Sequence, residues 1–185
     1  MSWINEIEPE QAEGELKALY GLVENSRRKV SNVMKVHSLR PASMQNHLTL
    51  YMDLMFAPGG LSRRQREMIA VVVSRENRCD YCVAHHREAL ARYVSDTVLL
   101  DAICNGGQTA NVAPADRELM AYAAKLTCAP VSVSADDLQR LRDNGIAEAD
   151  ILLANLIVAY FNFVNRIALG LGVAFTEAEV SGYEV

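Results

Sequence analysis

Two helical patterns stand on either side of a break at Asn77-Arg78, and together they fill the stretch from Ser62 to Leu90. The first pattern opens with Ser62 and Gln65, whose spacing is typical of a capping box at the start of a helix. It continues through an apolar run at residues 68–73, which predicts a mostly buried helix. If the chain reverses at the break, the stretch forms two antiparallel helices, and the rest of the chain has to enclose them.

The second pattern carries the residues with the most reactive chemistry. Cys79 and Cys82 form a CxxC pair, which closes into a disulfide with little rearrangement and whose sulfurs ionise more readily than isolated thiols. A helix that starts near Cys79 would place that sulfur at a helix N-terminus, where free N–H groups favour a thiolate. His86 follows Cys82 by four residues, so we expect the two side chains on one helix face and within hydrogen-bonding reach.

Glu67 joins this group through the predicted helix reversal. It lies ten residues before the break at residue 77, and His86 lies nine residues after it, so antiparallel helices would bring the carboxylate level with the imidazole. A carboxylate in an apolar run usually has a partner, because burying it alone is costly. The sequence therefore predicts a proton relay in which Glu67 orients His86, His86 exchanges a proton with Cys82, and Cys79 resolves the oxidised product.

The CxxC pair has three other interpretations, namely a zinc site, a pair of inert core thiols and a thioredoxin-like motif. Cys79, Cys82 and His86 could bind zinc, but a structural zinc site needs a fourth ligand and the chain has no second CxxC or HxxxH motif. The two thiols could also be inert core residues, as buried free cysteines often are. A thioredoxin-like motif requires a βαβ context, and strand patterns are almost absent from this chain.

Length and charge narrow the class of protein. A chain of 185 residues forms one domain, here expected over residues 1–185, and is long enough to bury a sizeable core. Its net charge of −5 argues against nucleic acid or an anionic membrane as a main partner. The N-terminus has no secretory pattern, and Asn162, Asn165 and Arg166 interrupt the longest apolar stretch, so no membrane span is expected. We therefore expect a cytoplasmic protein in which Cys104 and Cys128 stay reduced.

Helical spacing and breakers predict an all-α fold along the whole chain. An arm at residues 1–9, with Trp3, precedes the first helix, and a Met-rich helix runs from Pro41 to Phe56 before Ala57-Pro58-Gly59-Gly60 stops it. The arm and the Met-rich helix offer enough apolar surface to predict a homo-oligomer. The remaining helices are expected at residues 10–25, 62–76, 79–93, 95–104, 116–126, 134–144 and 148–169, with a last turn from residue 176.

A weak internal repeat relates the stretch at 62–90 to residues 145–173. An offset of 85 residues aligns Gly60-Leu61-Ser62 with Gly145-Ile146-Ala147 and Asn77 with Asn162. The second copy would have kept the packing and lost the chemistry, because apolar residues replace the four reactive ones. Chance similarity between two apolar helices explains the match equally well.

The spacing Glu67-x11-Cys79-x2-Cys82-x3-His86 in a helical chain resembles the superfamily of AhpD-like alkylhydroperoxidases and carboxymuconolactone decarboxylases. Similarity to its peroxidase-related branch extends to AYAAKLTCAPVSVSADDLQRLRDNGI and AYFNFVNRIALGLGV, so that it covers roughly residues 40–173. The resemblance implies a multihelical AhpD-like fold, assembly into homo-oligomers and a thiol peroxidase activity that needs no cofactor. It implies that Cys82 attacks the hydroperoxide, Cys79 resolves it, and Glu67 with His86 relays protons.

One residue departs from the superfamily pattern. The best-known AhpD proteins have a histidine between the two cysteines, where this chain has Tyr81. The departure leaves the proton path open, together with the electron donor, which the resemblance implies to be a dithiol on a lipoylated or thioredoxin-like protein. His85 could take over part of the missing role, although exposure on the helix is the simpler expectation. A decarboxylase, or a redox-responsive oligomeric scaffold without enzymatic activity, remains an alternative function.

Overall fold

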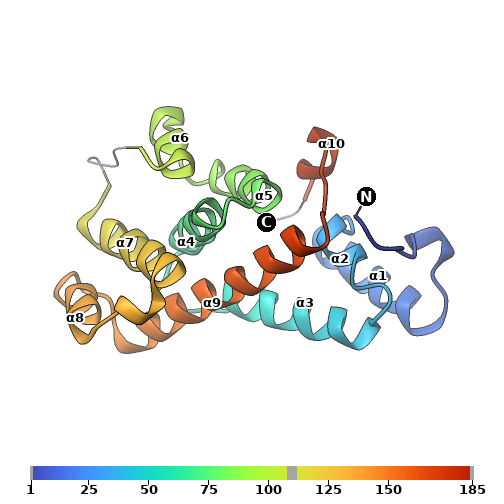
Figure 1. The fold of residues 1–185 in the computed structure, drawn as a ribbon, viewed down its shortest axis with the longest axis horizontal. Helices are drawn as coiled ribbons and strands as arrows, with labels where there is room; N and C mark the ends of the chain where they lie inside the picture. The colour runs from blue at the N-terminus through green and yellow to red at the C-terminus, as the bar shows by residue number, and fades with distance from the viewer. Residues whose placement is uncertain (1, 108–111, 184–185) are drawn as a thin grey trace.

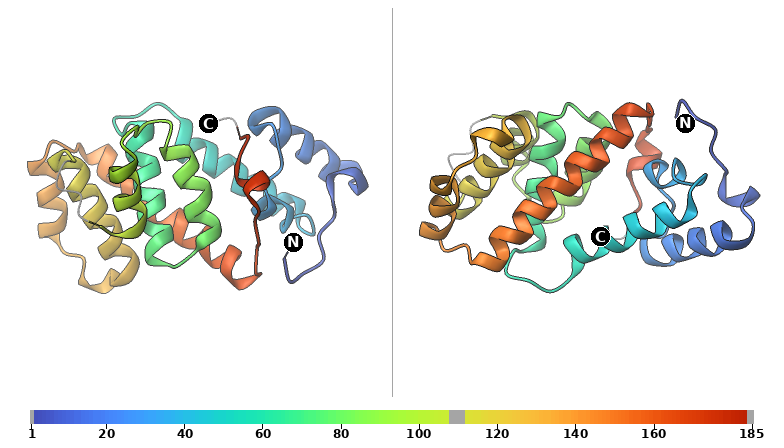
Figure 2. Two further views of the ribbon diagram at one scale, coloured as in Figure 1. Left: turned by 90° about the horizontal axis from the view of Figure 1, so that it is seen from above. Right: turned by 60° about the horizontal axis from the view of Figure 1, so that its bottom comes forward.

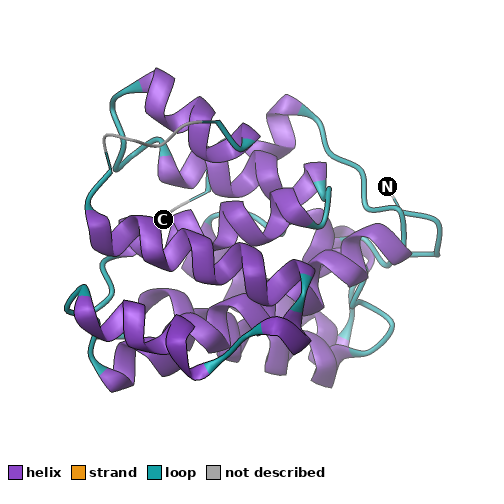
Figure 3. Cartoon of the chain, turned by 60° about the vertical axis from the view of Figure 1, so that its left-hand side comes forward, coloured by secondary structure: helices purple, strands orange, loops and turns teal. Residues whose placement is uncertain are grey.

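A computed structural model describes residues 2–107 and 112–183, and within these ranges every regular element is helical (Figures 1 and 3). The all-α fold predicted from the sequence is therefore confirmed. The elements in chain order are η1 Pro9–Gln11, α1 Gly14–Arg27, α2 Asn32–Lys35, α3 Pro41–Phe56, α4 Arg63–Glu76, α5 Asp80–Leu90, α6 Thr97–Asn105, α7 Pro114–Cys128, η2 Pro130–Ser132, α8 Ala135–Asp143, α9 Glu148–Gly170 and α10 Glu177–Val180.

Helix α4 is the centre of the main core. It packs against α5, α6, α7 and α9, and its side chains from Arg66 to Ser74 are all buried. The capping box predicted at Ser62 and Gln65 is present: Ser62 Oγ accepts from the Gln65 N–H, and the Gln65 side chain accepts from the Ser62 N–H. The box provides acceptors for N–H groups at the start of the helix, which have no partner within the helix.

The long helix α9 crosses the molecule beside α4, α7 and α3 (Figures 1 and 2). By length and composition it could cross a membrane, but half of its most apolar window is buried among the other helices, as in the core helix of a soluble protein. Its exposed face is also apolar and includes Leu152, Leu156, Phe163 and Leu169.

A second, smaller core joins the N-terminal helices. Leu16, Leu19, Tyr20 and Val23 of α1 pack against Val30, Met34 of α2 and Met44 of α3. Met44 and Met55 are almost completely buried inside this chain, whereas Leu50 and Phe56 of the same helix remain exposed. Trp3 does remain 79% exposed; its ring lies on Gly172, and its backbone N–H donates to the Leu171 carbonyl.

Most expected boundaries differ from the observed ones by a few residues. The first α-helix begins at Gly14 rather than Glu10, because Pro9 starts a separate 3-10 turn. The run at residues 26–40, which had no clear pattern, contains the short helix α2, and the connector at 129–133 contains the turn η2. The expected last turn is α10, capped by the hydroxyl of Thr176. The relation proposed between residues 62–90 and 145–173 stays a prediction.

Candidate active site

The reversal between α4 and α5 is tight and sets the register of the site. Arg78 adopts a left-handed conformation with φ of 55°, and the N–H of Cys79 donates to the Ser74 carbonyl at 2.9 Å. Helix α5 then starts at Asp80, so that Cys79 occupies its N-cap position. The predicted antiparallel hairpin therefore forms, and the two helices pack along their lengths.

This register brings Glu67 and His86 together. Nδ1 of His86 donates to the Glu67 carboxylate at 2.7 Å, and Nη2 of Arg63 donates to the other carboxylate oxygen at 2.6 Å. Glu67 is completely buried. Burial raises the pKa of the Glu67 carboxyl, but His86, Arg63 and Arg27 outweigh that effect, so the pKa lies below its ordinary value. The carboxylate is thus held charged and fixes which imidazole nitrogen carries a proton.

The two cysteines lie side by side as free thiols, and both are buried. The thiol of Cys82 donates a hydrogen bond to the sulfur of Cys79, and the backbone N–H of Cys82 adds a second one. These bonds lower the pKa of Cys79 despite its burial. The pKa of Cys82 is raised, because its thiol donates to Cys79 and is buried. Of the two thiols, Cys79 is therefore the one that its surroundings make easier to ionise.

No described hydrogen bond joins His86 directly to Cys82, although both side chains line one pocket. Nδ1 of His86 is occupied by Glu67, which leaves Nε2 as the nitrogen that can accept a proton in the pocket. The direct imidazole–thiol contact expected from the i, i+4 spacing stays a prediction.

Asn165 of α9 contacts Cys82 and was not singled out from the sequence. Its side chain hydrogen-bonds to the Cys82 thiol and lowers the pKa of that group, against the larger effects of Cys79 and burial. It is fully buried and held in place by Asn77 and Ser74, at 2.9 and 3.2 Å. The available signal was an amide in an apolar helix: such a residue needs polar partners, but the sequence does not show which ones.

The pocket beside the cysteines has a volume of about 100 Å³. Cys82 and His86 line it, whereas Cys79 does not. Much of the remaining wall is apolar or aromatic and comes from six parts of the chain, including Val23 of α1, Tyr51 of α3, Phe161 of α9 and Tyr183 near the C-terminus. Of the two sulfurs, only Cys82 therefore faces a space that could hold a small molecule.

A buried polar pair, His47 and Tyr160, also lines this pocket. Nε2 of His47 lies 2.9 Å from the Tyr160 hydroxyl, and burial lowers the pKa of His47 to about 3, with a further contribution from His37. The His47 imidazole is therefore neutral, and its Nε2 accepts a hydrogen bond from the Tyr160 hydroxyl. His37 itself is buried, and its Nδ1 lies 2.9 Å from the Val33 carbonyl oxygen.

Residues 174–183, which we call the C-terminal strap, form the outer wall of the pocket. The strap lies between α5 and the N-terminal helices (Figures 1 and 2), and Val180 and Tyr183 face the pocket. Lys29 donates to the carbonyls of Ala178 and Ser181, at 2.6 and 2.9 Å. Arg92 of α5 donates to the Tyr183 carbonyl at 2.8 Å, so the strap is tied to both of its neighbours.

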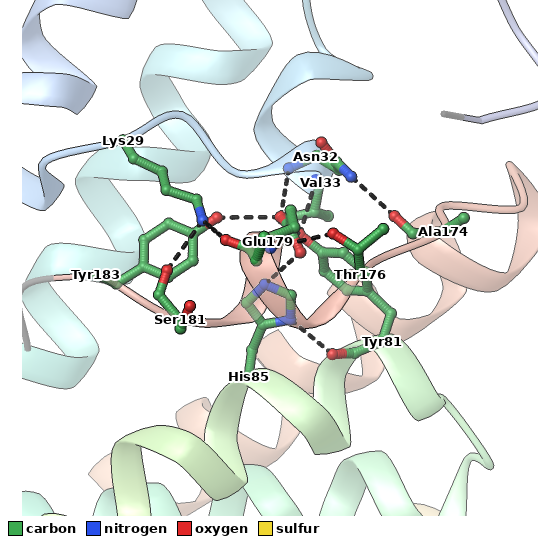
Figure 4. A network of polar contacts seen from close by, with 11 residues as sticks. Lys29, Asn32, Val33, Tyr81, His85, Ala174, Thr176, Glu179, Ser181 and Tyr183 are labelled. Atoms are coloured by element: carbon green, nitrogen blue, oxygen red, sulfur yellow. Dashed lines mark hydrogen bonds and ion pairs between the residues drawn. The ribbon is translucent and has the colours of Figure 1, made fainter.

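Glu179 is the central residue of this attachment (Figure 4). One of its carboxylate oxygens accepts from the N–H of Asn32 at 3.0 Å and from the hydroxyls of Tyr81 and Tyr183, at 3.2 and 3.0 Å. The other lies 2.9 Å from Nε2 of His85. Burial raises the pKa of Glu179, but the larger combined effect of its hydrogen bonds and of His85 lowers that pKa below its ordinary value. Glu179 is therefore held as a carboxylate.

The positions of Tyr81 and His85 answer part of the question left by the missing inter-cysteine histidine. The Tyr81 hydroxyl accepts from the Val33 N–H and donates to Glu179, and Nδ1 of His85 donates to the Tyr81 carbonyl (Figure 4). The expectation that His85 is exposed is wrong, because its side chain is 13% exposed beneath the strap. Both residues hold the strap, and neither is hydrogen-bonded to a cysteine in the described contacts.

The part of the chain that the structure describes contains no group of three or more His, Cys, Asp or Glu side chains arranged to bind a metal. The Cys79, Cys82 and His86 set that suggested zinc is therefore not assembled as a ligand cluster. His86 is already bonded through Nδ1 to a carboxylate, and Cys82 to Cys79 and Asn165.

Comparison with known proteins gives matches in fold and in sequence. A model of the carboxymuconolactone decarboxylase family matches residues 41–110. The AhpD-core, peroxidase-related protein from Ralstonia eutropha JMP134 is 26% identical, with a TM-score of 0.86 over 97% of this chain and 94% of that one. A peroxidase-related protein from Silicibacter sp. TM1040 has the same identity and coverage, with a TM-score of 0.85. These structures confirm the AhpD-like helical fold. No curated protein sequence matches the chain.

The debrominase Bmp8 is a more distant structural relative. It is 17% identical, with a TM-score of 0.75 over 89% of this chain and 88% of the debrominase. At this identity the likeness shows a shared fold.

Proposed function

Because the chain belongs to the superfamily of AhpD-like alkylhydroperoxidases and carboxymuconolactone decarboxylases, we propose that it is a thiol-dependent peroxidase that reduces hydroperoxides through its CxxC pair. The observation that carries the proposal is the placement of Cys82. Its sulfur lines a small, largely apolar pocket, and Cys79 lies behind it within hydrogen-bonding distance. A pocket of this kind gives an organic hydroperoxide access to one sulfur and gives that sulfur an immediate partner.

The first step consumes the hydroperoxide. Nε2 of His86 accepts the proton of the Cys82 thiol, and the resulting thiolate attacks the terminal oxygen of the substrate. An S–O bond forms and the O–O bond breaks, so that sulfur loses two electrons and the peroxide gains them. The leaving alkoxide takes the proton back from His86 and departs as an alcohol. Cys82 is left as a sulfenic acid.

The second step closes the disulfide. Cys79 loses its proton, and its thiolate attacks the sulfur of the Cys82 sulfenic acid. An S–S bond forms, the S–O bond breaks, and the hydroxide that leaves is protonated to water. A dithiol reductant, proposed to be a lipoylated or thioredoxin-like protein, then returns two electrons and two protons to the pair.

Glu67 supports both steps without touching the substrate. It holds Nδ1 of His86 protonated, which keeps Nε2 free to exchange a proton in the pocket. Arg63 keeps the same carboxylate charged from the other side. Such support is typical of a histidine that acts as a general base and then as a general acid.

Activity measurements distinguish this proposal from its alternatives. We expect reduced protein to lose two thiols per chain with one equivalent of hydroperoxide, and to turn over when lipoamide or thioredoxin is supplied. A redox-responsive scaffold would oxidise once and stop. A decarboxylase would act on a lactone acid and would keep that activity when both cysteines are replaced by serine. Either result would replace the peroxidase assignment.

A halogenated aromatic compound is a second candidate substrate. The related fold of a debrominase and the aromatic side chains around Cys82, among them Tyr51, Tyr160 and Phe161, favour it. Cys82 would take a halonium from carbon, a proton would replace the halogen on the ring, and Cys79 would displace halide from sulfur to form the same disulfide. Release of halide from a bromopyrrole, in anaerobic assays without peroxide, would establish this reaction.

A further inference from the structure

The pocket that Cys82 faces also contains an arginine that forms no direct ion pair with a carboxylate of the described residues. Arg27, the last residue of α1, lines this pocket together with Tyr51 of α3. Its Nη1 donates to the Tyr51 hydroxyl at 2.9 Å, and its guanidinium carbon lies 5.0 Å from the centre of the Tyr51 ring and 5.3 Å from that of Phe56. The hydroxyl is a neutral acceptor, and Arg27 acts on the buried Glu67 carboxylate electrostatically, without a direct ion pair in the described contacts.

Other arginines in the described residues are arranged differently. Six of the thirteen others lie within salt-bridge distance of a carboxylate, namely Arg63, Arg64, Arg75, Arg87, Arg140 and Arg142. Arg27 is half-buried, yet the described residues provide no such ion pair for it. A guanidinium has five N–H donors in a planar fork that matches a carboxylate, and only one of the five has a described acceptor here.

The other charged residues around the pocket also favour an anionic ligand. Lys29 and Arg92 also line it, and both donate to backbone carbonyls of the strap rather than to carboxylates. The only carboxylate among the lining residues described is the exposed Glu88. A recess with aromatic walls and an excess of positive charge attracts anions, because the walls exclude the water that would otherwise screen the charge.

We propose that Arg27, with Tyr51, binds an anionic group of the substrate, so that the preferred hydroperoxides are small organic acids with a carboxylate at the end away from the peroxide. The inference rests on the proposed peroxidase function. The stacking of Arg27 on two rings holds its free N–H groups in place, which reduces the entropy lost when an anion binds. The pocket volume of about 100 Å³ suits a small organic molecule.

The test compares two hydroperoxides of the same shape. 3-Hydroperoxy-3-methylbutanoate carries a carboxylate where tert-amyl hydroperoxide carries a methyl group. We expect the wild-type protein to favour the acid in kcat/KM by about 10- to 100-fold, the range for a hydrogen bond to a charged group. In Arg27→Gln the acid-to-neutral ratio should fall close to one, and in Arg27→Lys, which keeps the charge but loses the fork, it should be intermediate. The control variant Arg87→Gln, whose arginine pairs with Asp101 at the surface, should keep the wild-type ratio.

A binding measurement separates this inference from the peroxidase assignment. 3,3-Dimethylbutanoate has the shape of the acid substrate but no peroxide, and its affinity is measured by titration calorimetry on the reduced wild-type and Arg27→Gln proteins. Binding that depends on Arg27, without turnover of either hydroperoxide, would retain the anion site and reject the peroxidase function. Turnover with equal preference for the two hydroperoxides, or a preference that Arg27→Gln keeps, would overturn the anion site.

Discussion

The carboxylate of Glu67 contacts side chains from two helices. One oxygen lies 2.7 Å from Nδ1 of His86 on α5, and the other lies 2.6 Å from Nη2 of Arg63, one turn earlier on α4. The sequence predicted the contact with His86, and the structure adds the ion pair with Arg63. Both contacts are present at once, and both are buried around a carboxylate with no exposed surface.

Replacing Glu67 by Gln should impair catalysis more than folding. The amide has nearly the same shape, but it no longer holds Nδ1 of His86 with a charge. We expect kcat/KM for hydroperoxides to fall by about 10²- to 10⁴-fold, the usual range for general acid–base groups. Circular dichroism should show an unchanged helical content. Wild-type turnover in the variant would remove Glu67 from the site.

The same carboxylate should make stability depend on pH. Its pKa in the folded protein lies below the ordinary value of 4.5, so the unfolded chain takes up a proton first as the pH falls. The stabilising contribution of Glu67 is therefore complete above about pH 4.5 and is lost as the pH falls through the lower, folded pKa. Urea unfolding at several pH values should show the wild-type protein approaching Glu67→Gln in free energy of unfolding below that pH. A difference that stays constant down to pH 3 would contradict the pKa shift.

The two cysteines should fail in different ways when each is replaced by serine. Cys82→Ser should abolish peroxide reduction, because the only sulfur that faces the pocket is gone. Cys79→Ser should react once per chain and stall as a sulfenic acid on Cys82, which mass spectrometry detects after trapping. A sulfenic acid on Cys79 in an active Cys82→Ser protein would reverse the two roles.

Asn165 provides a test of how Cys82 is ionised. Its hydrogen bond lowers the pKa of Cys82, so Asn165→Leu should raise that pKa further. Alkylation rates measured against pH in a Cys79→Ser background report the thiolate directly. Asn162→Leu is the matched control, because Asn162 shares the bond to Asn77 but has no described contact with Cys82. Equal profiles for the two variants would exclude a specific role for Asn165.

The homo-oligomer predicted from the sequence is best tested on α9. Its exposed face carries Leu152, Leu156 and Phe163, and burial of such a face between copies would remove apolar surface from water. We expect light scattering to give at least a dimer, and Leu156→Glu to shift it toward the monomer. The control Val98→Glu changes an exposed residue of α6. A particle of 20.4 kDa at micromolar concentration would contradict the prediction.

The sequence predicted the parts of the site that depend on local spacing. The capping box at Ser62, the break at Asn77-Arg78 and the helical spacing from Cys82 to His86 together determine the α4–α5 hairpin, and with it the pairing of Glu67 and His86. The contacts that it missed join residues far apart in the chain. Asn165 reaches Cys82 from α9, and Glu179 reaches Tyr81 across 98 residues, which no periodic pattern records.

The attachment of the strap to Tyr81 limits how this motif can be changed. Tyr81, the residue directly before Cys82, has its hydroxyl hydrogen-bonded to both Val33 and Glu179. It is therefore a structural anchor as well as a neighbour of the reactive sulfurs. A histidine placed there to restore the more familiar motif would be too short to reproduce both bonds. Engineering of the redox pair in this protein would therefore have to redesign the wall of its own pocket at the same time.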